Sequence, residues 1–255
     1  MRDGEPVVEV QNLTVRFGDR EVLSDVSAAF PRGEISVILG ASGSGKTTLL
    51  KHVLGLMPAP EDTIRVFGRS LENLSPEEFD ALRRRIGMLF QHGALLNSVS
   101  IHRNTRVPLE QHTSLPDPII DSVVRAKLGL VGLAGSEAAL PDELSGGMRK
   151  RAGLARAMAL DPELLLCDEP SSGLDPPTAE ALDRLLVRLH AQLDMSMIII
   201  SHDLVSVRRV AHRVFFLHEG RIRFSGSMEE AKQSTLPELR DYFRAAESEE
   251  VRGAE

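Results

Sequence analysis

The stretch GASGSGKTT at residues 40–48 directly follows the apolar run Ile35–Leu39. An unbroken apolar run predicts a strand covered on both faces, and a helix is expected from Lys46 to Gly55. Glycines between such a strand and helix let backbone N–H groups point at phosphate oxygens, and the helix dipole adds positive charge. The stretch predicts a phosphate-binding loop made of Gly40, Ala41, Ser42, Gly43, Ser44, Gly45, Lys46, Thr47 and Thr48.

Composition and length set broad limits on what this chain can be. It has 255 residues, of which 26% are charged and 42% are hydrophobic, and its formal net charge is −7. The length accommodates one large domain or a domain with an inserted subdomain. The negative net charge does not favour a nucleic-acid surface, so no nucleic-acid partner is expected. The single cysteine, Cys167, excludes an internal disulfide and is interpreted as a core residue.

No membrane-spanning segment is predicted. No apolar run approaches the ~18 residues that a transmembrane helix requires. The start, Met1–Pro6, is polar and lacks the apolar core of a signal peptide. We therefore expect a soluble chain whose membrane role, if it has one, depends on a partner.

Strand-like and helix-like segments alternate over most of the chain, which predicts an α/β fold with a largely parallel sheet. A capping box at Ser75 opens a helix through Arg85, and the acidic tail after Glu247 is expected to fray. We predict a core formed by residues 1–92 and 163–235, a helical insertion at 93–162 and a C-terminal extension at 236–255. Expected strands are Val7–Val10, Leu13–Phe17, Ile35–Leu39, Ile86–Phe90, Leu164–Cys167, Met197–Ser201, Val214–Leu217 and Ile222–Phe224. One further helix, Pro177–Leu193, has a leucine stripe at Leu182, Leu185, Leu186, Leu189 and Leu193.

Two carboxylates end one of the predicted strands. Asp168 is an oxygen ligand of the type that Mg²⁺ prefers, and the Thr47 hydroxyl is a second candidate ligand. Glu169 follows directly and is a candidate to orient or deprotonate an attacking water. Two solvated carboxylates at a strand end are the alternative, but the phosphate loop upstream favours the catalytic interpretation.

Two other polar side chains follow predicted strands. Gln91 comes directly after Ile86–Phe90, where an amide can contact Mg²⁺ or water and report whether the γ-phosphate is present. His202 follows Met197–Ser201, where an imidazole can hydrogen-bond the γ-phosphate. Neither residue is informative alone, because exposed glutamines are common and a lone histidine is usually structural.

A second phosphate-binding phrase lies in the predicted helical insertion. Ser145, Gly146 and Gly147 would present a hydroxyl and backbone N–H groups at a helix start, which is an anion site. Because this phrase is remote from the phosphate loop, one chain holds two half-sites. We expect a head-to-tail dimer in which each nucleotide lies between one loop and the second copy's Ser145.

Together these motifs resemble the nucleotide-binding subunit of ABC transporters over essentially the whole chain. The resemblance implies ATP and Mg²⁺ as cofactors and a RecA-like P-loop ATPase core with an antiparallel β subdomain and an inserted α-helical subdomain. It also implies that Phe17 stacks on adenine and that Asp175 belongs to a nucleotide-contacting loop. One departure is Met148, where most members carry Gln. The motifs occur in family order: Walker A at 40–48, Gln91, the signature at 144–148, Walker B at 164–168, Glu169, the D-loop at 172–175 and His202.

Three stretches are similar to the ATPases of Mla/Mce-type phospholipid transport systems: Gly87–Leu95, Pro108–Thr113 and Glu143–Ala157. This resemblance implies a permease partner at the cytoplasmic face of the inner membrane, an Mce-domain lipid-binding subunit and a small STAS-domain subunit. Arg103 departs from the acidic residue usual at its position. The alternatives are the ATPase of another ABC importer or exporter, and a non-transport ABC ATPase acting on DNA or ribosomes. The latter typically carries coiled-coil insertions or two fused ATPase units, and this chain has neither.

Overall fold

The computed structural model describes residues 4–252, so Met1, Arg2 and Asp3 of the polar start lie outside the described residues. The chain divides into two compact units: residues 1–79 with 196–255, and residues 80–195. They are called unit 1 and unit 2, and each is described by itself. Unit 2 contains both the predicted helical insertion, residues 93–162, and three elements predicted to belong to the core: β6 (Ile86–Leu89), β7 (Leu164–Asp168) and α6 (Pro176–Leu193). The subdomain boundaries predicted from sequence stay a prediction.

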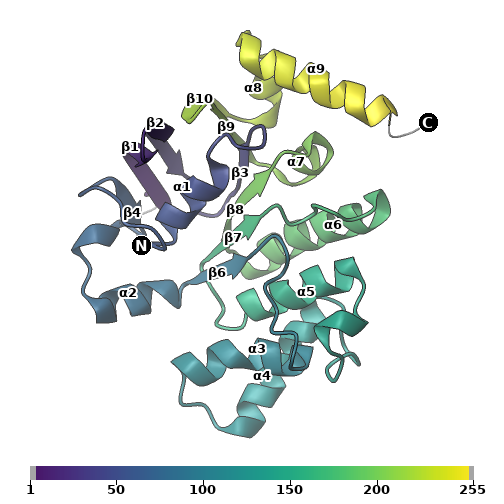
Figure 1. Cartoon of the computed structure of the whole chain (residues 1–255). Helices are drawn as coiled ribbons and strands as arrows, with labels where there is room; N and C mark the ends of the chain where they lie inside the picture. Colours follow the sequence, from purple (N-terminus) through teal and green to yellow (C-terminus); the bar gives the residue numbers. More distant parts are fainter. Residues whose placement is uncertain (1–3, 253–255) are drawn as a thin grey trace. The chain divides into compact units, whose positions relative to one another are not determined.

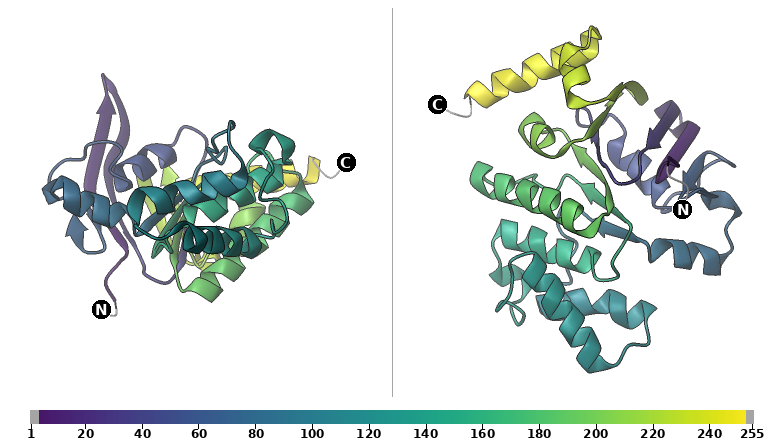
Figure 2. Two further views of the ribbon diagram at one scale, coloured as in Figure 1. Left: turned by 90° about the horizontal axis from the view of Figure 1, so that it is seen from below. Right: turned by 180° about the vertical axis from the view of Figure 1, so that it is seen from behind.

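Unit 1 contains an antiparallel sheet in the order β2-β1-β4-β5. Its strands are β1 (Val8–Phe17), β2 (Arg20–Phe30), β4 (Ile64–Val66) and β5 (Arg69–Ser70), and Figure 2 shows β1 and β2 as the long purple pair. Two short strands were expected where β1 runs unbroken. The predicted gap falls where the pairing with β2 shifts register, between Val10 and Leu13, because Asn12 adopts φ 52° there. The sequence did not reveal β2, whose buried positions do not alternate regularly.

A second set of strands in unit 1 has the order β10-β9-β3-β8. Here β3 (Ile35–Leu39) runs parallel to both β8 (Ser196–Ser201) and β9 (Arg213–His218), and β10 (Arg221–Gly226) is antiparallel to β9. Every residue of β3 and β8 is buried, as expected for strands covered on both faces. The helices of unit 1 are α1 (Lys46–Val53), α7 (Leu204–Val210), α8 (Met228–Gln233) and α9 (Pro237–Arg252). The tail expected to fray is thus helical to Arg252.

Unit 2 pairs β6 (Ile86–Leu89) in parallel with β7 (Leu164–Asp168). Its helices are α3 (Ile101–His112), α4 (Asp117–Leu130), α5 (Gly146–Ala157) and α6 (Pro176–Leu193), and α2 (Pro76–Arg83) crosses from unit 1 into unit 2. Four leucines of the predicted α6 stripe are buried, but Leu193 is 38% exposed. That assignment was wrong because α6 ends at Leu193 and Asp194 turns the chain with φ 49°. Short 3₁₀ turns occur at Leu71–Asn73 and Pro141–Glu143.

Cys167 lies in β7 with no exposed surface, which confirms its interpretation as a core residue. Burial raises the pKa of its thiol to about 12. The thiol is therefore neutral at physiological pH and unreactive in the folded chain.

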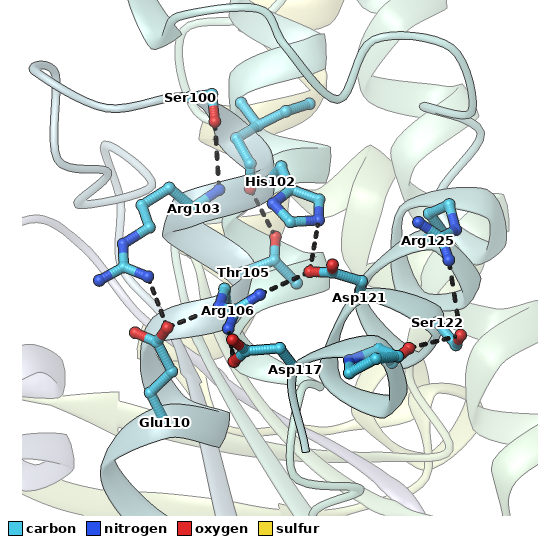
Figure 3. A network of polar contacts seen from close by, with 12 residues as sticks. Ser100, His102, Arg103, Thr105, Arg106, Glu110, Asp117, Asp121, Ser122 and Arg125 are labelled. Atoms are coloured by element: carbon cyan, nitrogen blue, oxygen red, sulfur yellow. Dashed lines mark hydrogen bonds and ion pairs between the residues drawn. The ribbon is translucent and has the colours of Figure 1, made fainter. Parts of the chain in front are cut away.

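Ion pairs join α3 to α4, as Figure 3 shows. The Arg106 side chain is only 13% exposed and donates to Glu110 of its own helix at 2.5 Å and to Asp121 of α4 at 2.6 Å. It also pairs with Asp117 at the start of α4. Arg103 donates to the same Glu110 carboxylate, which therefore holds two arginines. Because one guanidinium bridges both helices at several points, the α3–α4 pair is held as a single element. Within residues 4–252, no helix is both long and apolar enough to cross a membrane.

Candidate nucleotide site

The phosphate loop of unit 1 has two positions that only glycine can fill. A Cβ at Gly40 would lie 2.2 Å from the carbonyl oxygen of Leu217, and one at Gly45 would lie 2.6 Å from Leu23 Cδ2. Gly45 also adopts φ 106°, which L side chains rarely tolerate. By contrast, a Cβ at Gly43 would have nothing within 4 Å. The loop is therefore packed tightly against the protein at both ends and open at its tip.

Lys46 is folded back over this loop. It is 6% exposed, and its Nζ donates to the carbonyl oxygens of Gly40 at 2.7 Å and Ala41 at 3.0 Å. The nearby Ser44 hydroxyl is buried and has no hydrogen-bond partner. A buried donor without a partner and an ammonium group on the same loop fit a phosphate group, which accepts several hydrogen bonds. Residues Ala41, Ser42, Gly43 and Thr47 of the loop are exposed.

His202 emerges beside the phosphate loop. The parallel pairing of β3 with β8 aligns Leu39 with Ser201, so Gly40 and His202 leave neighbouring strands at the same edge. In α/β proteins, ligands bind at the carboxyl ends of parallel strands. The His202 side chain is exposed, and its backbone is fixed by a hydrogen bond: the Tyr242 hydroxyl of α9 donates to the His202 carbonyl oxygen at 2.7 Å. Phe17, which the family resemblance predicts to stack on adenine, also lies in unit 1 and is 49% exposed at the end of β1.

Unit 2 brings Gln91 and the two predicted carboxylates to one edge in the same way. The pairing of β6 with β7 aligns Leu89 with Cys167, so Gln91 and Asp168 lie just beyond aligned positions. Asp168 is 8% exposed, and Glu169 adopts φ 49°. A left-handed conformation at a non-glycine residue costs of order 1–3 kcal/mol and persists only where surrounding contacts hold it. Among the described residues no group of three His, Cys, Asp or Glu side chains could hold a metal ion.

A lysine that the sequence did not single out joins these two loops. The Nζ of Lys150, on α5, donates to the backbone carbonyl oxygen of Gln91 and to that of Glu169 at 3.2 Å. Lys150 is 6% exposed. Burial lowers the pKa of its ammonium group, and the nearby carboxylates of Glu169 and Asp168 oppose that shift. The contact gives the strained Glu169 backbone a charged donor. No local pattern predicts it, because the partners come from three separate segments.

The signature phrase is the start of α5, as expected. Ser145 is the N-cap residue, and its Oγ accepts from the backbone N–H of Met148 at 3.2 Å. A Cβ at Gly147 would lie 2.4 Å from Cγ2 of Thr178, so α5 and α6 approach closely there. Asp175 caps α6 by accepting from the Thr178 N–H at 3.1 Å, and a hydrogen bond from the Thr178 hydroxyl is the main cause that lowers the pKa of this carboxyl.

Comparison with known proteins identifies the family. A family model described as "ABC transporter" matches residues 23–172. The chain belongs to the ABC transporter family. Family membership confirms the resemblance inferred from the motifs and implies a nucleotide-binding domain.

The curated relatives of this ABC protein cover most of its length. It is 40% identical over 228 residues to "Intermembrane phospholipid transport system ATP-binding protein MlaF" of Haemophilus influenzae, covering 89% of this chain and 86% of that protein. It is 36% identical over 237 residues to MlaF of Escherichia coli K12, covering 93% and 88%. It is also 40% identical over 236 residues to "Probable ribonucleotide transport ATP-binding protein mkl" of Mycobacterium tuberculosis CDC 1551, covering 92% of this chain but only 66% of that protein.

Solved structures confirm the predicted ABC ATPase fold. The chain resembles cbiO1 from Clostridium perfringens with a TM-score of 0.81 at 26% identity, covering 94% of this chain and 99% of that one. It resembles the dimeric ATP-binding cassette MJ0796 bound to ADP and Pi with a TM-score of 0.78 at 26% identity, covering 87% and 98%. Both matches cover more of the chain than unit 1 or unit 2 contains by itself.

The Lys150 contact yields a test of the site. Lys150→Met keeps the apolar stem but removes the donor shared by Gln91 and Glu169. Hydrogen bonds from a charged group contribute about 1.5–3 kcal/mol each, so ATP turnover should fall by at least ten-fold. ATP affinity should change little, because the phosphate loop is untouched. Steady-state ATPase kinetics and nucleotide titration measure both quantities.

The matched control is Lys127→Met, because Lys127 is also 6% exposed but pairs with Asp161, away from these loops. Equal losses of turnover in the two folded variants would contradict a specific role for Lys150.

Proposed function

We propose that this chain hydrolyses ATP as the nucleotide-binding subunit of a transporter that moves phospholipid between membranes. The observation that supports hydrolysis is the pair of strand edges, one bearing the phosphate loop with His202 and the other bearing Gln91, Asp168 and Glu169. The lipid substrate is supported by the 40% identity to a protein named for intermembrane phospholipid transport. We propose that the chain is held at the cytoplasmic face of the inner membrane by binding to a permease.

The proposed chemistry divides the site residues by role. The loop from Gly40 to Thr48 binds the phosphates, and Phe17 offers its exposed ring for adenine. Glu169 acts as the base for the attacking water, while Gln91 and His202 contact the γ-phosphate end. Thr47 and Asp168 are the proposed Mg²⁺ ligands, since each supplies the oxygen donor that this ion prefers. When bound, Mg²⁺ supplies charge neutralisation of the phosphates.

The second half-site supports a dimer as the active form. Ser145 caps α5 at the start of the signature phrase, so backbone N–H groups and a hydroxyl are presented together. We propose that Ser145, Gly146 and Gly147 contact the nucleotide bound by a second copy of this chain. The MJ0796 cassette, which this chain resembles, forms a dimer in its structures.

A groove in unit 2 is the proposed docking site for the permease. Its volume is about 320 Å³, and it is lined by residues from α2, β6, α3 and α5, including Met88, Phe90, Pro108 and His112. The loop after Gln91 is anchored to α5, because Arg156 donates to the carbonyl oxygens of Ala94 at 2.7 Å and Gly93 at 2.9 Å. The lining places apolar side chains beside charged ones, which suits an amphipathic helix of the permease. An Mce-domain subunit and a STAS-domain subunit complete the proposed complex.

A ribonucleotide transporter is the second candidate, because the mkl relatives are named for it at the same 40% identity. The chain spans 66% of the length of that relative, so that protein has segments with no counterpart here. The MlaF relative is matched over 86% of its length, which favours the phospholipid assignment.

Reconstitution tests the proposed activity. The complex purified with its permease should move labelled phospholipid between vesicle populations only with hydrolysable ATP. Glu169→Gln keeps size and hydrogen bonding but removes the base, which is worth roughly 10²–10⁴-fold in rate. Both hydrolysis and lipid movement should collapse in this variant while ATP binding persists. Transport of labelled ribonucleotide without lipid movement would replace the lipid assignment, and near-normal turnover of the variant would remove Glu169 as the base.

Charge placed in the loop after Gln91 tests docking. Leu96, in the loop after Gln91, is 52% exposed, so Leu96→Glu should fold normally. A buried charge in an apolar interface is costly, so permease binding and permease-stimulated turnover should be lost while basal turnover persists. Leu193→Glu is the control, because Leu193 is similarly exposed on α6. Normal stimulation of the Leu96→Glu complex would show that this loop does not dock the permease.

A further inference from the structure

A pocket on one face of α6 contains none of the proposed phosphate-loop or Mg²⁺-binding residues. Its volume is about 390 Å³, which falls in the range of about 300–1,000 Å³ typical of small-molecule sites. It lies where α6 meets the start of α5, and Figures 1 and 2 show these two helices as neighbours. The lining residues of α6 recur every three or four positions and so form one stripe along the helix: Pro177, Thr178, Ala181, Leu182, Leu185 and Arg188.

This stripe is apolar along most of its length and cationic at one end. Leu182 and Leu185 are 2% and 5% exposed, and with the buried Val131 they form an apolar floor. From Pro177 to Arg188 the stripe extends about 16 Å, because an α-helix rises 1.5 Å per residue. An elongated pocket with this division suits a ligand that has an apolar chain and a single anionic group.

A second guanidinium group lies at the cationic end. Arg151 of α5 donates through Nη1 to the carbonyl oxygens of Val131 and Gly132, each at 3.2 Å. Arg188 donates through Nη2 to the carbonyl oxygen of Leu130 at 3.4 Å. Three consecutive carbonyl groups at the end of α4 therefore orient both guanidinium groups. These carbonyl groups are neutral, so they position the two charges without cancelling them.

The two positive charges have no carboxylate partner. Within residues 4–252, neither Arg151 nor Arg188 forms an ion pair, and no carboxylate belongs to the pocket lining. A guanidinium group carries five N–H donors, and each of these arginines uses only one of its nitrogen atoms for the contacts to α4. The remaining N–H groups can therefore donate to an anion, and a planar carboxylate accepts two such hydrogen bonds side by side.

We propose that this pocket binds an aliphatic carboxylate, with its anionic group at Arg151 and Arg188 and its chain along the α6 stripe. Guanidinium groups are weakly hydrated and match the planar geometry of a carboxylate, and each methylene removed from water adds to the affinity. This site is additional to the proposed ATPase function and does not depend on it.

Isothermal titration of the full chain tests the chemistry of the ligand. Decanoate, kept below the concentration at which it forms micelles, should bind saturably at one site per chain. Decyltrimethylammonium has the same chain length and the opposite charge, so it should bind at least ten-fold more weakly. Acetate has the carboxylate without the chain and should give no measurable binding.

Substitutions on α6 locate the site. Arg188 is exposed, so Arg188→Gln should fold normally and weaken decanoate binding by at least ten-fold, because it removes a charged donor. The matched control is Arg184→Gln on the same helix, because Arg184 is 77% exposed, pairs with Glu180 and lies outside the pocket lining. Ala181→Phe should abolish binding by filling the stripe. Lys46→Ala, which disables the phosphate loop, should leave the affinity unchanged.

Several outcomes would overturn this carboxylate site. Absence of saturable decanoate binding would do so, as would equal affinity for decyltrimethylammonium, which would indicate an apolar surface only. Equal losses in Arg184→Gln and Arg188→Gln, full affinity in Ala181→Phe, or loss only in Lys46→Ala would place the ligand elsewhere. Vesicles of phosphatidylglycerol provide a further arm, because their capture of the chain without any binding of decanoate would replace the free carboxylate with a membrane surface.

Discussion

The hydrogen bonds of the Lys150 ammonium group are the interaction on which the proposed catalytic residues of unit 2, Gln91 and Glu169, depend. The ammonium group reaches the backbone carbonyl oxygens of Gln91 and Glu169, which leave the two parallel strands β6 and β7. Glu169 adopts a left-handed conformation directly after β7, and such a conformation persists only when surrounding contacts enforce it. A buried cation shared between two carbonyl groups is such a contact, because moving either loop would take one acceptor away from a desolvated charge.

The helix that carries Lys150, α5, also connects two other parts of unit 2. The same helix begins at the signature phrase, where Ser145 is its N-cap, and carries Arg156 near its end. Arg156 holds the loop after Gln91 through the carbonyl oxygens of Gly93 and Ala94, and Gly153 packs so closely on that loop that a Cβ would lie 3.1 Å from Gly93. One rigid helix thus joins the signature, the proposed base and the proposed docking loop.

The sequence predicted the segments whose environment is uniform along their length. β3, β7 and β8 are buried throughout, so their unbroken apolar runs identified them, and the polar residues at their ends marked the candidate site. It missed β2, because its burial is irregular, and α7 to α9, which are short or largely polar. It also missed Lys150 and Tyr242. Their roles come from contacts with distant segments, and a basic or aromatic residue on a helix carries no local sign of its partner.

In the proposed dimer, each nucleotide site is completed by the α5 helix of the second copy. This arrangement is tested most directly by heterodimers carrying Lys46→Ala, in the phosphate loop, and Ser145→Arg, at the start of α5. With one substitution on each chain, both defects fall in one composite site and the other site is intact. With both substitutions on one chain, each site is damaged. If the two chains share their sites, the first arrangement should retain about half of native ATP turnover and the second far less. Equal turnover in the two arrangements would show that each chain hydrolyses ATP alone, which would contradict the account.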